Sequence, residues 1–514
     1  MIEHTTIIHA AMTMSRDVTN CLQYNIYSFA PLLYLRAKNG ILIYSGILER
    51  MNVMLRDIVT DKRRLFEDGA ESELRCQENR TRAVSVVSGN LTANTRSEVS
   101  GVSARVYKNG VSGFSSEADL TKEAAERVLK AATENADFMD SRVRKGTGPL
   151  PCVGGDPVIK PCEISDPEQK VYIDLAREVD AYIEKKYPNL RGRGISVRAD
   201  SMEKFVCASG GADGHTVIPR CYVYVRMTAD SPSGSPVELF VPVGGYGTVD
   251  TVFASVSSVF SAADELYEKL MRKREGVYAE AGLKTCILGG ELAGMLSHEA
   301  VGHTVEADLV LGGSVAAHSL GKQVASELVT MVDYAHTAFG KPTPLPVYID
   351  DEGVKAEDQT LIQDGVLVGY MNNRDTAKRF GMKPRGNARA YLFSDEPLIR
   401  MRNTAIVPGK SKLEEMIESV EDGYYFLDTN NGQADTTGEF MFGICMGYEI
   451  KKGRLGRAIL DTTISGVAFE MLKSVDMISD NMHWASSGFC GKKQPMPVGL
   501  GGPEVRCKVN VGGR

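Results

Sequence analysis

The sequence predicts an α+β protein with two main folded domains. Its 514 residues are too many for a single compact hydrophobic core. The first half alternates strand-like runs with amphipathic helices, whereas the second half consists mostly of strands and hairpins. We therefore expect an N-terminal α/β-type domain with hairpins and helices at residues 57–280 and a C-terminal strand-rich domain at residues 281–514. Residues 1–56 show no clear period or turn signal, and we expect them to form an N-terminal appendage.

Composition and charge indicate a globular protein that binds neither nucleic acid nor membrane. Hydrophobic residues make up 43% of the chain and charged residues 24%. The formal net charge of −7 argues against nucleic acid, because neutralising phosphates requires a basic surface. The apolar stretch 22–48 is interrupted by Arg36, Lys38 and Asn39, and no secretory signal precedes it. The ten cysteines form no CxxC pair, which is typical of reduced, mostly buried thiols, so we expect a cytoplasmic protein.

The clearest local signal in the first half is a hairpin followed by a helix. Residues 103–114 alternate around Asn109-Gly110, the sequence preferred in a type I′ turn. A helix is expected next, capped near Asp119 or Thr121. Its buried face is predicted to contain Ala124, Ala125, Val128, Leu129 and Ala132.

Periodicity and turn residues predict the remaining elements. A second helix is expected to begin at Asp166-Pro167, with proline at the first helical position, and to end before Pro188. Asp364-Gly365 and Lys452-Gly453 are expected to separate pairs of strands. The acidic pair Asp350-Asp351 is predicted to lie on a solvated turn. Further strands are predicted at 221–226, 237–241 and 285–288, and further helices at 261–273, 291–308, 374–380, 412–420 and 467–475.

The helix predicted at 291–308 carries the residues with the clearest chemistry. It contains His298, Glu299 and His303, an HExxxH pattern. Neutral imidazoles bind zinc, and a carboxylate beside them can take a proton from water. Apolar residues precede the pattern, which favours a partly dry site. The pattern therefore predicts a metal-binding helix in the strand-rich domain.

A catalytic zinc site needs a third protein ligand, and spacing alone does not choose it. Glu306 lies on the same helical face as His303 and could bind the metal or accept a hydrogen bond from a ligand. Cys490 is flanked by glycine and by Lys492 and Lys493, which would favour a thiolate. The candidates left open are His318, His336, His483, Glu306, Asp308 and the cysteines.

The spacing of the two histidines conflicts with regular α-helix geometry. Each residue turns the helix by about 100°, so positions five apart lie about 140° from one another. A π-bulge, with its i→i+5 hydrogen bond, would bring both imidazoles to one face. We predict a local break from α geometry between His298 and His303 that involves Gly302, whose backbone is the least restricted.

Two segments resemble the signatures of a known family. Residues 294–308 (Gly-Met-Leu-Ser-His-Glu-Ala-Val-Gly-His-Thr-Val-Glu-Ala-Asp) and residues 489–501 (Phe-Cys-Gly-Lys-Lys-Gln-Pro-Met-Pro-Val-Gly-Leu-Gly) are similar to those of the TldD/PmbA family of metalloproteases, also called modulators of DNA gyrase. The hairpin and helix at 102–132 resemble its N-terminal domain, and Arg385-Gly-Asn387 resembles a loop of the family. The chain departs from the pattern at Ala390, where a second basic residue is expected.

This resemblance implies a zinc-dependent metallopeptidase. It implies Zn²⁺ held by His298, His303 and Cys490, with Glu299 as general base. It also implies peptides or small unfolded proteins as substrates, and a dimer with a second copy or with a metal-free relative. Two alternatives stay open at this point. One is a non-catalytic peptide-binding scaffold subunit, and the other is a thiol peptidase that uses Cys490 and a histidine.

Overall fold

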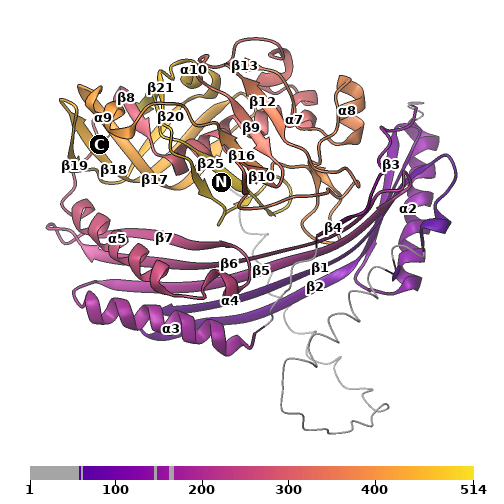
Figure 1. Cartoon of the computed structure of the whole chain (residues 1–514), viewed down its shortest axis with the longest axis horizontal. Helices are drawn as coiled ribbons and strands as arrows, with labels where there is room; N and C mark the ends of the chain where they lie inside the picture. Colours follow the sequence, from indigo (N-terminus) through magenta and orange to yellow (C-terminus); the bar gives the residue numbers. More distant parts are fainter. Residues whose placement is uncertain (1–56, 59–61, 144–147, 161–166, 514) are drawn as a thin grey trace, which may run out of the picture. The chain divides into compact units, whose positions relative to one another are not determined.

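The computed structural model describes residues 57–58, 62–143, 148–160 and 167–513, and the appendage predicted at 1–56 lies outside them (Figure 1). Within these residues the chain mixes long antiparallel strands with helices, which confirms the α+β class. The division into domains at residues 57 and 281 stays a prediction. None of the described helices is long and apolar enough to cross a lipid bilayer.

The first half forms a seven-stranded sheet in the order β3-β2-β1-β5-β6-β4, and β7 also pairs with β6. Helices α3 and α5 lie along one face of this sheet (Figure 1). Its strands are β1 (Glu71–Val87), β2 (Asn90–Lys108), β3 (Val111–Glu117), β4 (Val158–Lys160), β5 (Gly192–Ala208), β6 (Asp213–Asp230) and β7 (Pro236–Tyr246). Its helices are η1 (Arg63–Leu65), α2 (Lys122–Val143), α3 (Gln169–Lys186), α4 (Val249–Val252) and α5 (Ser257–Lys273).

The local predictions for this half are mostly confirmed. Asn109 and Gly110 have φ of 49° and 93°, as a type I′ turn requires, and they join β2 to β3. The Thr121 hydroxyl accepts a hydrogen bond from the Ala124 backbone at 3.2 Å, so Thr121 caps α2. All five residues of the predicted apolar face of α2 are buried. The predicted strands 221–226 and 237–241 lie within the longer β6 and β7, and the predicted helix 261–273 lies within α5.

The predicted start of the second helix is wrong. Helix α3 begins at Gln169 after the N-cap Glu168, so Pro167 precedes the helix instead of opening it. Asp166 lies outside the described residues. The predicted end before Pro188 is confirmed, because α3 ends at Lys186.

The second half contains two larger sheets and three short ladders. One sheet has the order β17-β8-β26-β20-β18-β19, with β21 beside β26, and the other has the order β13-β12-β9-β16-β25-β22. The first comprises β8 (Gly282–Leu288), β17 (Asp422–Ala434), β18 (Glu439–Lys451), β19 (Arg454–Ala458), β20 (Thr462–Val467), β21 (Met477–Ile478) and β26 (Val505–Val511). The second comprises β9 (Met331–Tyr334), β12 (Gln359–Gln363), β13 (Val366–Leu367), β16 (Asn403–Ile406), β22 (His483–Ala485) and β25 (Gly499–Gly502). The ladders pair β10 (Thr337–Ala338) with β11 (Lys341–Pro342), β14 (Ala388–Arg389) with β15 (Leu398–Ile399), and β23 (Phe489–Cys490) with β24 (Met496–Pro497).

Short helices connect these strands, and the turns fall where the sequence predicts. Residues Asp364-Gly365 and Lys452-Gly453 have positive φ and join β12 to β13 and β18 to β19. The helices are α6 (Gly290–Met295), η2 (Leu296–Gly302), η3 (His303–Val305), α7 (Ala307–Leu311), η4 (Val315–His318), α8 (Arg374–Phe380), α9 (Leu413–Glu418) and α10 (Ala468–Lys473).

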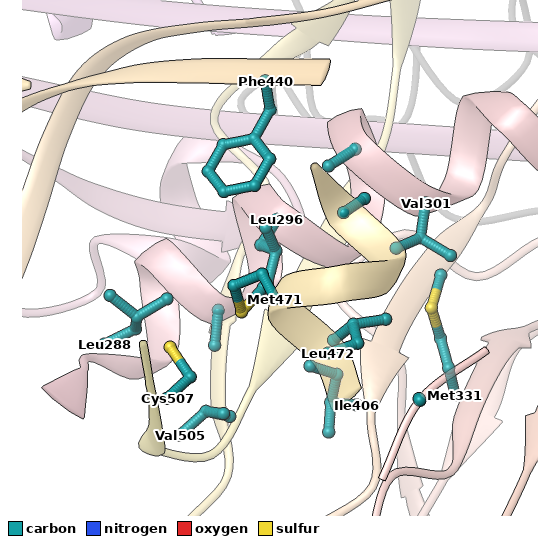
Figure 2. Close-up of a cluster of buried hydrophobic side chains, with 14 of the residues drawn as sticks. Leu288, Leu296, Val301, Met331, Ile406, Phe440, Met471, Leu472, Val505 and Cys507 are labelled. Atoms are coloured by element: carbon teal, nitrogen blue, oxygen red, sulfur yellow. The ribbon is translucent and has the colours of Figure 1, made fainter. Parts of the chain in front are cut away.

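The largest apolar core lies in this second half and surrounds the histidine-bearing segment. Leu296 and Val301 are fully buried and flank His298 and Glu299 in the chain (Figure 2). They pack with side chains from both sheets and from α10. The backbone between the two histidines is therefore anchored in close-packed apolar surroundings. The labelled members of this core are Leu288, Leu296, Val301, Met331, Ile406, Phe440, Met471, Leu472, Val505 and Cys507.

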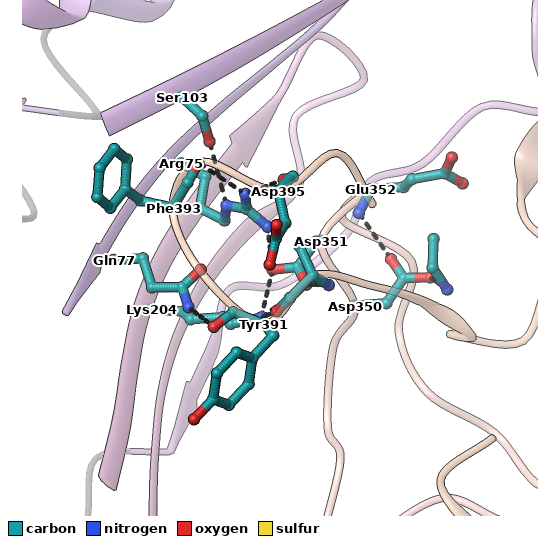
Figure 3. A network of polar contacts seen from close by, with 12 residues as sticks. Arg75, Gln77, Ser103, Lys204, Asp350, Asp351, Glu352, Tyr391, Phe393 and Asp395 are labelled. Carbon is teal, nitrogen blue, oxygen red and sulfur yellow. Dashed lines mark hydrogen bonds and ion pairs between the residues drawn. The ribbon is translucent and has the colours of Figure 1, made fainter. Parts of the chain in front are cut away.

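A buried polar network joins the first sheet to a loop of the second half (Figure 3). Asp351 pairs with Lys204 of β5 at 2.7 Å and with Arg75 of β1 at 3.4 Å. Arg75 also donates to the carbonyl of Asp395 at 2.7 Å. The prediction that Asp350-Asp351 is solvated is wrong, because both side chains are buried. The carboxylate of Asp350 instead accepts hydrogen bonds from the backbone of its own loop.

The cysteines described by the structure are free thiols, and all of them except Cys152 are buried. This confirms the expectation that the cysteines at these positions are mostly buried. Cys21 and Cys162 lie outside the described residues. The described cysteines are Cys76, Cys152, Cys207, Cys221, Cys286, Cys445, Cys490 and Cys507.

Candidate metal centre

The segment that carries the two histidines departs from α geometry, as the spacing predicts. It runs from α6 into the π-helical η2 and then into the 3₁₀-helical η3, which begins at His303. The His303 backbone N–H donates to the carbonyl of His298, the i→i+5 bond of a π-helix. The two imidazole rings consequently face each other edge-on, with centroids 5.2 Å apart.

Gly302 is involved for a different reason from the predicted one. Its backbone is right-handed helical, with φ −55° and ψ −49°, so the position needs no special conformational freedom. A Cβ atom there would lie 2.1 Å from Sδ of Met401, which is fully buried. Gly302 is required because Met401 occupies the space of a side chain.

Cys490 reaches the histidines from the distant hairpin β23–β24. Its Sγ lies 3.3 Å from Nε2 of His303. The ligand atoms of His298, His303 and Cys490 all lie within 4.8 Å of one another, and they are the one such cluster of His, Cys, Asp and Glu found in the described part of the chain. Two imidazole nitrogens and a thiolate are a donor set typical of zinc.

The surroundings of His298 fit a bound cation. The residue is 1% exposed, and neither ring nitrogen has a hydrogen-bond partner among the described residues. Burying a polar group without a partner costs free energy. A metal ion bound to one of these nitrogens would remove part of that cost, so the residues present fit the group.

The charges of these side chains favour a thiolate beside an imidazolium. Burial opposes ionisation of Cys490, but the imidazoles of His298 and His303 outweigh it and lower the pKa of the thiol to about 4. Burial also opposes the charged form of His303, but Glu306 and Cys490 raise the pKa of His303 to about 10. Binding a metal would therefore release the proton of His303.

Glu306 contacts His303 on the ring nitrogen away from Cys490, and neither Glu306 nor Asp308 belongs to the cluster of ligand atoms. Oε2 of Glu306 lies 2.7 Å from Nδ1 of His303, so Nε2 is the ring nitrogen left to face Cys490. The Lys492 ammonium lies 3.2 Å from Oε2 of Glu306 and 2.8 Å from Oδ2 of Asp308. The predicted thiolate at Cys490 is confirmed, but its pKa is lowered by the two imidazoles, and the Lys492 ammonium pairs with these two carboxylates.

Glu299 is the carboxylate that faces the cluster. Its oxygens lie 3.7 Å from Nε2 of His303 and 3.9 Å from Nε2 of His298. Its side chain is 25% exposed, whereas that of His298 is 1% exposed. The carboxylate is therefore accessible to water beside the partly exposed ring of His303 and the buried ring of His298, a position suited to proton transfer.

The other candidate histidines are bound elsewhere or lie outside the cluster. His336 contacts the Thr337 hydroxyl at 3.0 Å. His483 contacts Oε1 of Glu504 at 3.0 Å. His318 ends the short helix η4 and is not part of the cluster.

Sequence reasoning missed Arg400. This residue of the second half of the chain binds the backbone at and just after Cys490. Its fully buried guanidinium donates to the carbonyls of Cys490, Lys492 and Gln494 at 2.7, 2.8 and 2.7 Å. Apolar and basic residues alternate at 399–402, a pattern that reads as a half-exposed strand. The pattern gave no signal that the arginine is buried.

Comparison with known proteins identifies the family. Residues 282–513 match the PmbA/TldA metallopeptidase C-terminal domain, and residues 72–136 and 160–282 match domain 1 and the central domain of the same family. The chain belongs to the PmbA/TldD metallopeptidase family. This family membership confirms the resemblance seen in the motifs.

Relatives and solved structures of this family cover most of the chain. A metalloprotease of Methanothermobacter thermautotrophicus is 31% identical over 458 residues, which are 87% of this chain and 97% of the relative. A zinc metalloprotease TldD homolog of Saccharolobus solfataricus is 33% identical over 300 residues, 56% of this chain and 67% of the relative. TldE of Thermococcus kodakarensis, at 17% identity, shares the fold with a TM-score of 0.70 over 90% of this chain and 100% of that structure.

Proposed function

We propose that this PmbA/TldD member is a zinc-dependent peptidase that hydrolyses peptide bonds in peptides or small unfolded proteins. The observation that carries the proposal is the clustering of His298, His303 and Cys490 beside the carboxylate of Glu299. The name of the Saccharolobus solfataricus relative, a zinc metalloprotease, supports the choice of metal.

In this proposal His298, His303 and Cys490 bind Zn²⁺, and Glu299 is the general base. Zinc bound there would polarise the scissile carbonyl and lower the pKa of a coordinated water to about 7. Glu299 accepts a proton from the attacking water and returns it to the leaving amine. Glu306 holds His303 with Nε2 toward the site, and Lys492 balances the charge of Glu306.

The strands around the site support an extended peptide as the substrate. Cys490 lies on the two-stranded ladder β23–β24, and β22 is a terminal strand of the neighbouring sheet. Strand edges can bind a peptide through backbone hydrogen bonds that do not depend on its sequence. Substrates that are unfolded and varied in sequence would suit this mode of binding.

We also propose a cytoplasmic dimer, formed with a second copy or with a metal-free relative, in which the site opens into a shared cavity that admits only extended chains. The dimer rests on the family resemblance alone. Free thiols at the described cysteines support a reducing compartment. Light scattering at working concentration tests the dimer, and a monomeric mass would contradict it.

A thiol peptidase is the second candidate, because Sγ of Cys490 lies 3.3 Å from Nε2 of His303. Against this role, Cys490 is only 3% exposed, and it shares its surroundings with a second imidazole and Glu299. A non-catalytic scaffold would have no need of Glu299. A chelator should abolish cleavage by a metallopeptidase, and iodoacetamide should leave the metal-loaded enzyme active.

The experiment is metal analysis of the purified protein together with cleavage of unfolded casein. We expect about one zinc per chain, loss of cleavage in a chelator and its return with added zinc. Cleavage that survives complete removal of metal and stops with iodoacetamide would support the thiol peptidase. Metal binding without cleavage would support the scaffold.

A further inference from the structure

The loop that leads to Cys490 contacts the first half of the chain, whereas Arg400 contacts Cys490 and the residues after it. Residues 486–488 lie between β22 and β23 and belong to neither strand. Irregular loops are more mobile than the elements they connect. A metal ligand must nevertheless be held to within about 0.5 Å of its binding geometry, so neighbouring residues must fix this loop.

Three alternate residues of β6 supply such contacts. Arg220, Tyr222 and Tyr224 lie two positions apart, so their side chains project from the same face of the sheet. Val223 and Val225 project from the other face and are fully buried in the core beneath α3 and α5. The first three side chains are therefore directed toward the second half of the chain.

Each of the three side chains bonds to the start of the loop. Nη1 of Arg220 donates to the carbonyl of Ser486 at 3.0 Å. The Tyr222 hydroxyl lies 2.6 Å from the Ser486 hydroxyl, and the Tyr224 hydroxyl donates to the carbonyl of Ser487 at 2.9 Å. These bonds lie three and four residues before Cys490.

Arg220 adds a second contact immediately before the ligand. Its guanidinium lies 4.9 Å from the centroid of the Phe489 ring, within the range of a cation–π interaction. Two bonds to the carboxylate of Asp200, at 2.9 and 2.8 Å, hold the guanidinium in place. Phe489 is 46% exposed, and its ring also packs edge-on against Tyr391, with centroids 6.0 Å apart.

We propose that Arg220, Tyr222 and Tyr224 form a positioning ladder through which the first half of the chain fixes Cys490 in the metal centre. The proposal rests on Cys490 being a ligand, as proposed above. The ladder holds the loop before Cys490, and Arg400 holds the carbonyls of Cys490 and the residues that follow it. With the loop fixed at both ends, Sγ is kept near His303 before a metal binds.

The test compares Tyr222→Phe/Tyr224→Phe with wild type as full-length proteins loaded with Co²⁺ or Zn²⁺. The variant keeps both rings and removes only the two hydroxyls. The matched control is Tyr182→Phe, which removes a hydroxyl 2.9 Å from Asp264 between α3 and α5, on the opposite face of the sheet. The readouts are the thiolate-to-cobalt absorption band, the rate of zinc release to a chelator and the Tm of each protein.

The ladder predicts that the double variant releases zinc about 10 to 100 times faster than wild type and has an altered thiolate band. The control should match wild type in both readouts at a similar Tm. If the double variant keeps the wild-type band and release rate while Cys490→Ser loses the band, the ladder is overturned and the ligand assignment stands. A wild-type band in Cys490→Ser would instead overturn the ligand assignment, and the ladder with it.

A double-mutant cycle distinguishes loss of the hydrogen bond between Tyr222 and Ser486 from a general loss of packing. Ser486→Ala removes the partner of the Tyr222 hydroxyl from the loop side. If the ladder acts through this bond, Ser486→Ala and Tyr222→Phe each speed zinc release, and combining them adds little. Fully additive effects would contradict a shared contact and overturn this part of the ladder.

Discussion

Nδ1 of His303 lies 2.7 Å from Oε2 of Glu306, a carboxylate that is fully buried. This contact fixes the ring so that Nε2 faces Sγ of Cys490. Carboxylates that hydrogen-bond a ligating imidazole set its tautomer and increase its basicity. Glu306 therefore acts on the proposed metal through His303.

We predict that Glu306→Gln weakens zinc binding by about 10 to 100 times. The matched control is Asp308→Asn, because Asp308 pairs with the same Lys492 ammonium but has no hydrogen bond to His303 in the structure. Competition with a chelator of known affinity measures both variants. Equal zinc affinity in Glu306→Gln and wild type would show that the contact does not support the metal.

Cys490→Ser should lose most of its zinc, because a hydroxyl is a far poorer zinc ligand than a thiolate at neutral pH. The control is Cys152→Ser, which changes the exposed thiol among the described cysteines. Elemental analysis after dialysis gives the zinc content of each protein. Unchanged zinc in Cys490→Ser would move the third-ligand assignment to another residue.

Gly302→Val should disturb zinc binding more than it disturbs the fold. The added side chain would meet Sδ of Met401, and an overpacked core is expected to cost about 1 to 3 kcal/mol of stability. The π-helical segment would move to relieve the clash, and His298 and His303 would separate. Circular dichroism should show a folded metal-free protein, while zinc analysis shows most of the metal lost.

The matched rescue for this prediction is Gly302→Val/Met401→Ala, which removes the atoms that the valine would meet. Partial return of zinc binding is expected. An unfolded Gly302→Val protein, or one that keeps its full zinc content, contradicts the role given to this glycine.

The raised pKa of Glu291 leads us to predict a pH dependence of stability that does not involve the proposed metal ligands. Burial, and then the charge of Asp428, raise its pKa to about 7 from 4.5, although Lys269 opposes the shift. Because the pKa of Glu291 is higher in the folded state, its protonated carboxyl stabilises the fold. This stabilisation is fully present below about pH 4.5 and is lost as the pH rises through 7. Glu291→Gln removes this loss. The free energy of unfolding of the variant minus that of wild type should therefore be larger at pH 8 than at pH 5, by on the order of 2 to 3 kcal/mol.

Urea unfolding of the chelated proteins at pH 5, 6, 7 and 8 measures this gain. Glu178→Gln, at an exposed position of α3, serves as the control. A constant difference between Glu291→Gln and wild type across this range would contradict the shifted pKa.

The sequence predicted features that depend on nearby residues better than those that depend on distant ones. The departure from α geometry between His298 and His303 follows from their spacing alone. In an α-helix the number of residues between two side chains sets the angle between them around the axis. The proposed third ligand could not be chosen in this way, since Cys490 lies on a hairpin far along the chain. Asp351 was wrongly placed in solvent because its partners, Lys204 and Arg75, belong to the first sheet.

The most direct test of Glu299 as the catalytic base measures zinc and activity on one preparation of Glu299→Gln. Glutamine keeps the shape of glutamate but cannot accept a proton at neutral pH, and the ligands are untouched. We predict about one zinc per chain and a peptidase kcat about 10² to 10⁴ times lower than that of wild type. Cleavage of unfolded casein at the wild-type rate by zinc-loaded Glu299→Gln would contradict the proposal that Glu299 is the catalytic base.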